Sequence, residues 1–248
     1  MEATDPGADP IALGPGRRIS RRDRARATRR RIIEAALKRF SDQGYAATNM
    51  DSIARHAGVA VQTVYFTFHT KAELLIAALT VAGGEPDEPE AVMERAWMGQ
   101  VIAAPSGPRR LALIAEFGND IYARVAPLLG AVSAAASVDP DVDRAWRNLV
   151  AKRRDGMRRI IDVFAARGDL RPGLDAALAL DLLFGVNRSE TYLAFTVECG
   201  WPMARYKAWQ FAVLARQLLP AAAADEALAP GSAVVADLSF AAELARFV

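Results

Sequence analysis

The residues in this sequence whose types and spacing could do chemistry are mainly cations near the N-terminus. Residues 10–71 carry 13 Lys and Arg against four acidic residues, whereas the chain from residue 72 onward carries 18 basic and 22 acidic residues. This asymmetry is hidden in a net charge of only +2. It predicts that the N-terminal third contacts a polyanion. For the arginine run alone, a solvated charged tail is the alternative interpretation.

Groups that do covalent or metal chemistry are sparse. The two histidines, His56 and His69, and the single cysteine, Cys199, are too scattered for a metal motif. The sequence has no Gly-rich phosphate loop and no nucleophile elbow. The neighbouring carboxylates of Asp141 and Asp143 are explained by the start of a helix. We therefore expect no catalytic residue, no metal and no cofactor, which argues against an enzyme.

The same residues predict a cytoplasmic protein without a membrane partner. Cys199 cannot form an internal disulfide, which suggests a reducing compartment. The apolar stretch 174–186 is interrupted by Asp175 and Asp181 and is too short to span a bilayer. The N-terminal arginines are not followed by the apolar segment of a signal peptide.

The elements that position these residues are expected to be helices. Apolar residues make up 52% of the chain and recur at steps of three and four, and Ala, Leu, Arg and Val dominate. We predict an all-α fold, with an N-terminal three-helix helix-turn-helix domain and a C-terminal helical bundle. The expected parts are a disordered arm (1–20), the helix-turn-helix domain (21–70), the bundle (71–219) and a flexible tail (220–248) that has room for a short helix. Helices of the bundle are expected at about 90–103, 108–125, 128–137, 140–167, 175–198 and 202–218.

Residues 48–68 predict two short helices joined by a tight turn. Thr48 and Asp51 match a capping box, and Gly58 tolerates the backbone angles of the turn. Such a pair fits DNA because one helix enters the major groove while the other crosses behind it. A plain helical hairpin is the alternative interpretation. The arginine-rich stretch just before it favours DNA, since phosphates require cations nearby.

At this point the sequence resembles a known family. Residues 24–80, and above all "IIEAALKRFSDQGYAATNMDSIARHAGVAVQTVYFTFHTKAELL", resemble the DNA-binding domain of the tetracycline-repressor (TetR) family. The features that carry the resemblance are, in order, Phe40, Gly44-Tyr45, Thr48, Ile53-Ala54, Ala57-Gly58-Val59, Tyr65, Phe66, Phe68 and Lys71. Further on, "RSETYLAFTVECGW" is similar to the family's last two helices. The recognition helix departs from the family pattern at two places. Ala60 replaces the usual capping Ser or Thr, and Val61-Gln62 replaces the usual Lys-Gly or Pro-rich pair of residues.

The resemblance implies DNA contacts for the recognition helix and its surroundings. Gln62, Thr63 and Thr67 would contact base edges, because Gln pairs bidentately with adenine and a Thr methyl meets the thymine methyl. Phe66 would pack on a sugar or a thymine methyl, or else belong to the core. The expected phosphate contacts are Thr48, Asn49, Tyr65 and Lys71, with His69 as a further candidate. Arg24, together with Arg21, Arg22 and Arg26, would reach the backbone or the minor groove.

The resemblance also implies a homodimer and a small-molecule pocket within the bundle. Helix 176–186, apolar nearly all round, supports a dimer independently, although it also fits the centre of a monomeric bundle. The expected pocket residues are Met93, Trp97, Phe117, Ile121, Tyr122, Trp146, Phe184 and Asn187, with Glu190 as a further polar group. At helical spacing, such aromatic residues and Met are more often part of the core than of a pocket.

The sequence therefore predicts a DNA-binding transcriptional regulator. Its partners would be double-stranded DNA with a palindromic operator, a second copy of the chain, and an unknown small-molecule effector that releases a repressor from the operator. A ligand-independent architectural DNA-binding protein is the first alternative, which the size of the bundle disfavours. A helical small-molecule-binding protein or an enzyme is the second.

Overall fold

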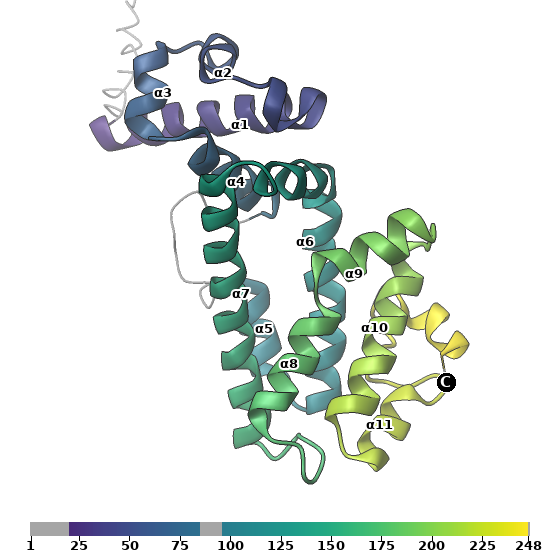
Figure 1. Cartoon of the computed structure of the whole chain (residues 1–248). Coiled ribbons are helices and arrows are strands. Elements are labelled where there is room, and N and C mark those ends of the chain that lie inside the picture. The colour runs from purple at the N-terminus through teal and green to yellow at the C-terminus, as the bar shows by residue number, and fades with distance from the viewer. Residues whose placement is uncertain (1–19, 85–95, 248) are drawn as a thin grey trace, which may run out of the picture.

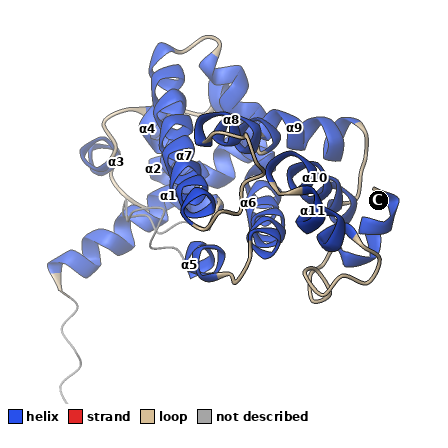
Figure 2. Cartoon of the chain, turned by 90° about the horizontal axis from the view of Figure 1, so that it is seen from below, coloured by secondary structure: helices blue, strands red, loops and turns tan. Residues whose placement is uncertain are grey.

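The structure of the chain, a computed structural model, describes residues 20–84 and 96–247, and every regular element there is a helix (Figure 2). The all-α prediction is confirmed. The helices are α1 (Arg21–Ala47), α2 (Met50–Ala57), α3 (Val61–Thr67), α4 (Lys71–Ala82), α5 (Ala96–Ala103), α6 (Gly107–Ala136), α7 (Pro140–Ala166), α8 (Ala176–Val186), α9 (Ser189–Leu193), α10 (Met203–Leu218) and α11 (Ala221–Leu228), with a π-helical turn at Ala194–Glu198 and a 3-10 turn at Ala241–Arg246. Residues 1–19 of the expected arm and Met93 lie outside the described residues, whereas Ser20 is described and caps α1. None of the helices in the described ranges is long and apolar enough to cross a membrane.

Helices α1, α2 and α3 form a head at one end of the molecule, and α4 leads from the head into the body (Figure 1). The apolar face predicted for α1 is buried, with Ile32, Ile33 and Phe40 at most 1% exposed. It packs against α2 and α4, where Ile53 and Leu74 are fully buried. This burial fixes how α2 and α3 are presented to the surroundings.

Two glycines and an asparagine determine how the helices of the head are connected. Gly44 (φ 76°) bends the end of α1, and Gly58 (φ 64°) makes the left-handed turn between α2 and α3. The predicted cap of α2 is wrong by one residue: Asn49, rather than Thr48, caps α2, and its Oδ1 accepts the Ser52 N–H at 2.8 Å. Asn is a somewhat better N-cap than Thr, whereas the spacing of Thr48 and Asp51 had favoured Thr48.

The first turn of α3 has no side-chain cap, because Ala60 occupies its N-cap position. We expect Ala60→Ser to stabilise the protein by about 1 kcal/mol, since a serine there can accept a free N–H of the first turn. For a protein of this size that raises the Tm by about 2–4 °C in a thermal melt. Ala123→Ser, at an exposed site inside α6, is the matched control and should not raise the Tm. Equal shifts for the two variants would contradict the capping argument.

The body is built around α6, α7, α8 and α10, and two of its helices differ from the sequence-based expectation. The stretches 108–125 and 128–137 were predicted as separate helices, but α6 runs unbroken through Pro127. Conversely, the helix predicted over 175–198 is interrupted at Asn187, whose backbone (φ −90°, ψ 30°) leaves the helical region. The Asn187 carbonyl is bound instead by side chains of α6 and α7, described below.

The segment after residue 219 also differs from the expectation of a flexible tail. It forms α11 and the 3-10 turn, and it packs on α10 and α6 at the side of the body (Figure 1). Phe240 is fully buried, with its ring centroid 5.7 Å from that of Phe211. Arg109 holds both carboxylate oxygens of Asp237 at 2.7 and 2.8 Å. Apolar burial and charge pairing together fix this segment in place.

Candidate nucleic-acid interface and cavity

Helix α3 presents polar and aromatic side chains on its outer face. Val64 is fully buried and anchors the helix, whereas Gln62 is exposed and Thr63 is half-buried. Tyr65 is 51% exposed and Phe66 is 87% exposed. This exposure excludes the core interpretation of Phe66. Two adjacent exposed aromatic side chains on one helix make this face a candidate contact surface.

The C-terminal end of α3 is tied to α1. Thr67 is half-buried, its hydroxyl donates to the Thr63 carbonyl at 2.7 Å, and Arg29 donates to the Thr67 carbonyl at 3.4 Å. The same guanidinium lies 4.1 Å above the ring of Phe68. The Thr67 hydroxyl is thus engaged within the helix, so Gln62 and Thr63 are the better candidates for base edges.

Two of the expected phosphate contacts serve inside the head instead. Thr48 is only 1% exposed, and its hydroxyl bonds to the carbonyls of Gly44 (2.8 Å) and Arg39 (3.2 Å). The Lys71 ammonium donates to the carbonyls of Tyr45 (2.9 Å) and Thr48 (3.0 Å) and lies 3.9 Å from the centre of the Tyr45 ring. Burial lowers the pKa of Lys71. Both side chains thus bind carbonyls at the end of α1, which favours a structural role over a phosphate contact for them.

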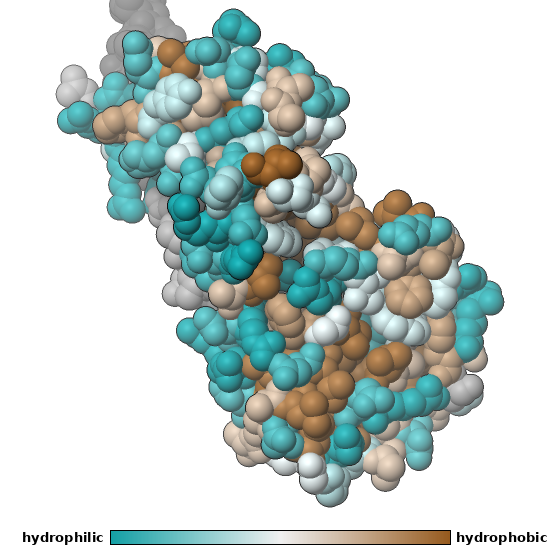
Figure 3. All heavy atoms as spheres, viewed as in Figure 1, coloured by the Kyte–Doolittle hydropathy of each residue, from teal (hydrophilic) through white to brown (hydrophobic). Residues whose placement is uncertain are grey.

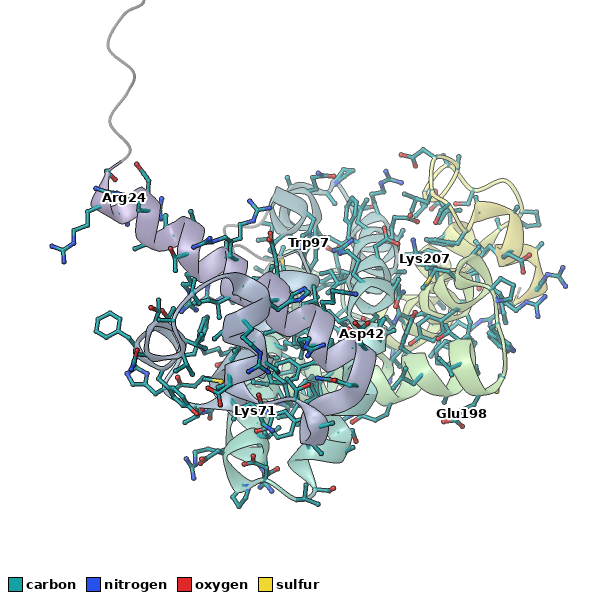
Figure 4. The ribbon with its side chains drawn as sticks, turned by 90° about the horizontal axis from the view of Figure 1, so that it is seen from above. Arg24, Asp42, Lys71, Trp97, Glu198 and Lys207 are labelled. Atoms are coloured by element: carbon teal, nitrogen blue, oxygen red, sulfur yellow. The ribbon has the colours of Figure 1, made fainter. Side chains whose placement is uncertain are left out.

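The remaining candidates lie at the surface of the head. Asn49 is exposed, and its side-chain oxygen is used as the cap of α2. The His69 ring is exposed beside Glu73, with Nδ1 3.4 Å from Oε2. Arg24 is exposed at the outer end of α1 (Figure 4), and Arg21, Arg22 and Arg26 are exposed on the same turns. The outer end of α1 is therefore strongly cationic.

A hydrogen bond joins the head to the body. The Tyr45 hydroxyl donates to Oδ2 of Asp139 at 2.7 Å, and Oδ1 of the same carboxylate caps α7 through the N–H groups of Asp141 (2.9 Å) and Val142 (3.3 Å). The Tyr45 hydrogen bond lowers the pKa of Asp139, which keeps this carboxylate ionised. The end of α1 and the start of α7 are thus held by one side chain.

Helix α7 continues from this joint along a cavity of about 130 Å³ inside the body. The cavity is lined by residues of α4, α5, α6, α7 and α8. They are Leu79, Thr80, Gly83, Trp97, Met98, Ile114, Gly118, Ile121, Tyr122, Val125, Leu129, Trp146, Leu149, Arg153, Gly156, Met157, Ile160, Leu183 and Asn187. Five of the expected pocket residues are among them: Trp97, Ile121, Tyr122, Trp146 and Asn187.

Two expected pocket residues do not line the cavity. Phe117 packs against Trp97, with 6.5 Å between ring centroids. Phe184 is half-buried between the guanidinium groups of Arg154 and Arg188, 5.3 and 5.7 Å from its ring. Glu190, the further polar candidate, is bound to Arg188 at 2.5 Å, and this bond lowers the pKa of Glu190 to about 2. Phe184 and Glu190 thus lie at the surface of α8 and α9, whereas Phe117 packs on α6 beside the cavity-lining Trp97.

The polar groups of the cavity gather where α8 ends. The Tyr122 hydroxyl donates to the Asn187 carbonyl at 2.5 Å and accepts a hydrogen bond from Arg153. Arg153 also donates to the Asn187 carbonyl at 3.0 Å. Burial raises the pKa of Tyr122, so the phenol stays protonated and can donate. The carbonyl freed by the break in the helix thereby gains two donors.

Arg153 is the functional candidate that the sequence interpretation missed. Its position follows Leu149 by four residues and precedes Met157 by four, so it lies on the predicted apolar stripe of α7. A charge on such a stripe is a usable signal, because a buried cation requires partners.

Comparison with known proteins assigns the class. Residues 32–78 match the bacterial regulatory proteins of the TetR family, and residues 109–194 match the tetracyclin repressor-like C-terminal domain. The chain belongs to the TetR family.

Particular relatives match parts of the chain. The HTH-type transcriptional regulator TtgW of Pseudomonas putida is 42% identical over 83 residues, which cover 32% of this chain and 61% of that protein. BetI of Rhizobium meliloti, a regulator of the same type, is 29% identical over 158 residues, covering 62% of this chain and 67% of BetI. The structure of FadR from Bacillus subtilis in complex with stearoyl-CoA has the same fold, with a TM-score of 0.57 at 21% identity over 75% of this chain and 95% of FadR.

Proposed function

We propose that this protein is a transcriptional repressor that binds a palindromic operator as a homodimer and leaves it when a small molecule enters the cavity. The observation that carries the proposal is the exposed outer face of α3, with Phe66 at 87% and Tyr65 at 51% exposure. Family membership supports it. In this proposal residues 21–70 bind DNA, residues 71–219 bind the effector and dimerise, and the protein acts in the cytoplasm without cofactor or catalysis.

The proposed DNA contacts use groups that remain available at the surface of the head. Gln62 and Thr63 contact base edges in the major groove, and Phe66 packs on a sugar or a thymine methyl. Tyr65 and the amide nitrogen of Asn49 contact phosphates, with His69 at the edge of the interface. Arg24 supplies positive charge to the backbone or the minor groove from the outer end of α1.

The proposed dimer uses the outer face of α8 and α10. Apolar side chains gather over these two helices on the face shown in Figure 3. On α8, Leu178 is 48% exposed, and Leu182 and Val186 are half-buried. A second copy would remove this apolar surface from water. Two heads related by a twofold axis would then meet two half-sites of a palindrome.

Release by an effector requires a connection between the cavity and the head, and two helices supply it. Helix α7 lines the cavity and begins at the Tyr45–Asp139 hydrogen bond. Helix α4 lines the cavity with Leu79 and Thr80, while its first residue, Lys71, holds the end of α1. A ligand that favours another spacing of these helices would change the spacing of the two heads.

The first experiment measures binding to the region upstream of the protein's own gene by gel retardation. We expect one palindrome to be retarded specifically, and we expect Thr63→Ala combined with Tyr65→Ala to abolish that retardation. Thr191→Ala on α9 is the control and should bind as the wild type does. If the double variant binds every fragment as strongly as the wild type, the assignment of α3 as the recognition helix is wrong.

A further inference from the structure

Arg153 is the one charged side chain among the described residues that line the cavity. It is half-buried and bonds to two other residues of the lining, Tyr122 and Asn187. The lining contains no Asp, Glu, Lys or His from the described part of the chain. Among the described lining residues, the charge is therefore positive and lies on Arg153 alone.

Arg153 also lacks the counter-ion that its neighbours have. Arg154 pairs with Asp181, and Arg188 pairs with Glu190 at 2.5 Å. Around Arg153, in contrast, no carboxylate of the described residues lies within 4.0 Å. Both of its hydrogen-bond acceptors, the Tyr122 hydroxyl and the Asn187 carbonyl, are neutral. A half-buried cation whose partners are all neutral gains a further charge-assisted hydrogen bond when an anion binds it.

The guanidinium has donors to spare for a ligand. Only Nη2 of Arg153 makes hydrogen bonds within the described structure, to Tyr122 and to Asn187. Nε and Nη1 make no hydrogen bond within the described residues, and neither atom is buried. Both can therefore still donate. Arginine binds planar carboxylates with two parallel N–H groups. A carboxylate can thus be accepted while the bonds to Asn187 stay in place.

The rest of the cavity suits an apolar body. The indoles of Trp97 and Trp146 line it together with aliphatic side chains such as Ile114 and Leu149. An apolar cavity of roughly 150 Å³ accepts benzene in other proteins. The cavity of this protein, at about 130 Å³, is of similar size.

We propose that the effector is an amphipathic organic anion, whose carboxylate binds Arg153 and whose apolar body lies between the two tryptophans. This inference rests on the proposed ligand-responsive function and specifies the chemistry of its ligand. Organic cations are disfavoured by Arg153. A neutral molecule of the same shape binds more weakly because it gains only uncharged hydrogen bonds.

The test compares carboxylates with their isosteric amides by titration calorimetry of the full chain without DNA. Two pairs are used, so that aromatic and aliphatic ligands can be compared. The aromatic pair is 1-naphthaleneacetate and 1-naphthaleneacetamide, and the aliphatic pair is octanoate and octanamide. We expect the carboxylate of at least one pair to bind about tenfold more tightly than its amide, or more, because hydrogen bonds between charged groups are stronger. We expect Arg153→Gln to remove that preference.

Matched variants exclude indirect effects. Arg154→Gln changes the neighbouring arginine, which faces Asp181, and should keep the preference for the carboxylate. Arg153→Lys retains the charge and should keep part of it, and circular dichroism verifies that each variant is folded. Equal binding of acid and amide, or no binding of either pair, overturns the inference. Because these titrations contain no DNA, they leave the gel-retardation test of the proposed function independent.

Discussion

Asp169→Ala is expected to lower the free energy of unfolding by about 3 kcal/mol. Asp169 pairs with Arg110, which is fully buried and also donates to the Ala104 carbonyl at 2.8 Å. Removing one partner of a buried ion pair leaves an uncompensated charge, which costs about 3–5 kcal/mol. We expect the lower end because the Asp169 side chain is 21% exposed and water can reach it. Urea unfolding at constant m-value measures the loss.

The adjacent arginine supplies the control for this prediction. Arg109 pairs with Asp237, whose side chain is 66% exposed, so Asp237→Ala should destabilise the protein much less than Asp169→Ala does. Combining Arg110→Met with Asp169→Ala removes the orphaned charge and should recover much of the loss. If both aspartate variants destabilise equally, burial of Arg110 is not the cause.

Lys71→Met is expected to destabilise the head without changing how DNA binding depends on salt. The variant keeps the apolar stem of the side chain but removes two hydrogen bonds to the carbonyls of Tyr45 and Thr48. Hydrogen bonds from a charged donor contribute about 1.5–3 kcal/mol, and the partial burial of Lys71 places the effect near the lower value. Chemical denaturation measures the loss of stability.

The salt dependence separates this role from a phosphate contact. Each phosphate contact contributes about 0.9 to the slope of log K against log salt, so a contacting lysine would reduce that slope when replaced. We expect an unchanged slope for Lys71→Met and a reduced slope for Arg24→Gln, whose side chain is exposed at the end of α1. A reduced slope with unchanged stability for Lys71→Met would restore the phosphate interpretation.

The head was predictable from sequence because short-range rules govern it. The apolar spacing of Ile32, Ile33 and Phe40 sets the buried face of α1, and Gly58 sets the turn before α3. The structural roles of Thr48 and Lys71 were not predicted, because they depend on contacts between residues far apart in the sequence. Thr48 and Lys71 have the types of phosphate-binding residues, but their polar atoms bind carbonyls at the end of α1. Residue type alone does not show which acceptor lies nearest in the fold.

The body was predictable only in outline. The break at Asn187 depends on donors from α6 and α7, and the packed segment after residue 219 depends on the apolar surface that α10 and α6 offer to Phe240. Both are tertiary effects that override local preference. The cavity was predicted in part, since five of the eight expected pocket residues line it. Arg153 was missed although it is a charge on the apolar stripe of α7, because the sequence does not show that it faces the cavity without a carboxylate partner.

The hydrogen bond between Tyr45 and Asp139 limits how freely heads can be exchanged between regulators. Asp139 binds the Tyr45 hydroxyl of the head and also caps α7 of the body, so it has a partner on each side of a junction between the two. A hybrid that receives a foreign head without a hydroxyl at the position of Tyr45 would leave this carboxylate short of one donor. Engineers who build sensors from this body should therefore transplant α1 together with its tyrosine, or redesign the first turn of α7 to match the incoming head.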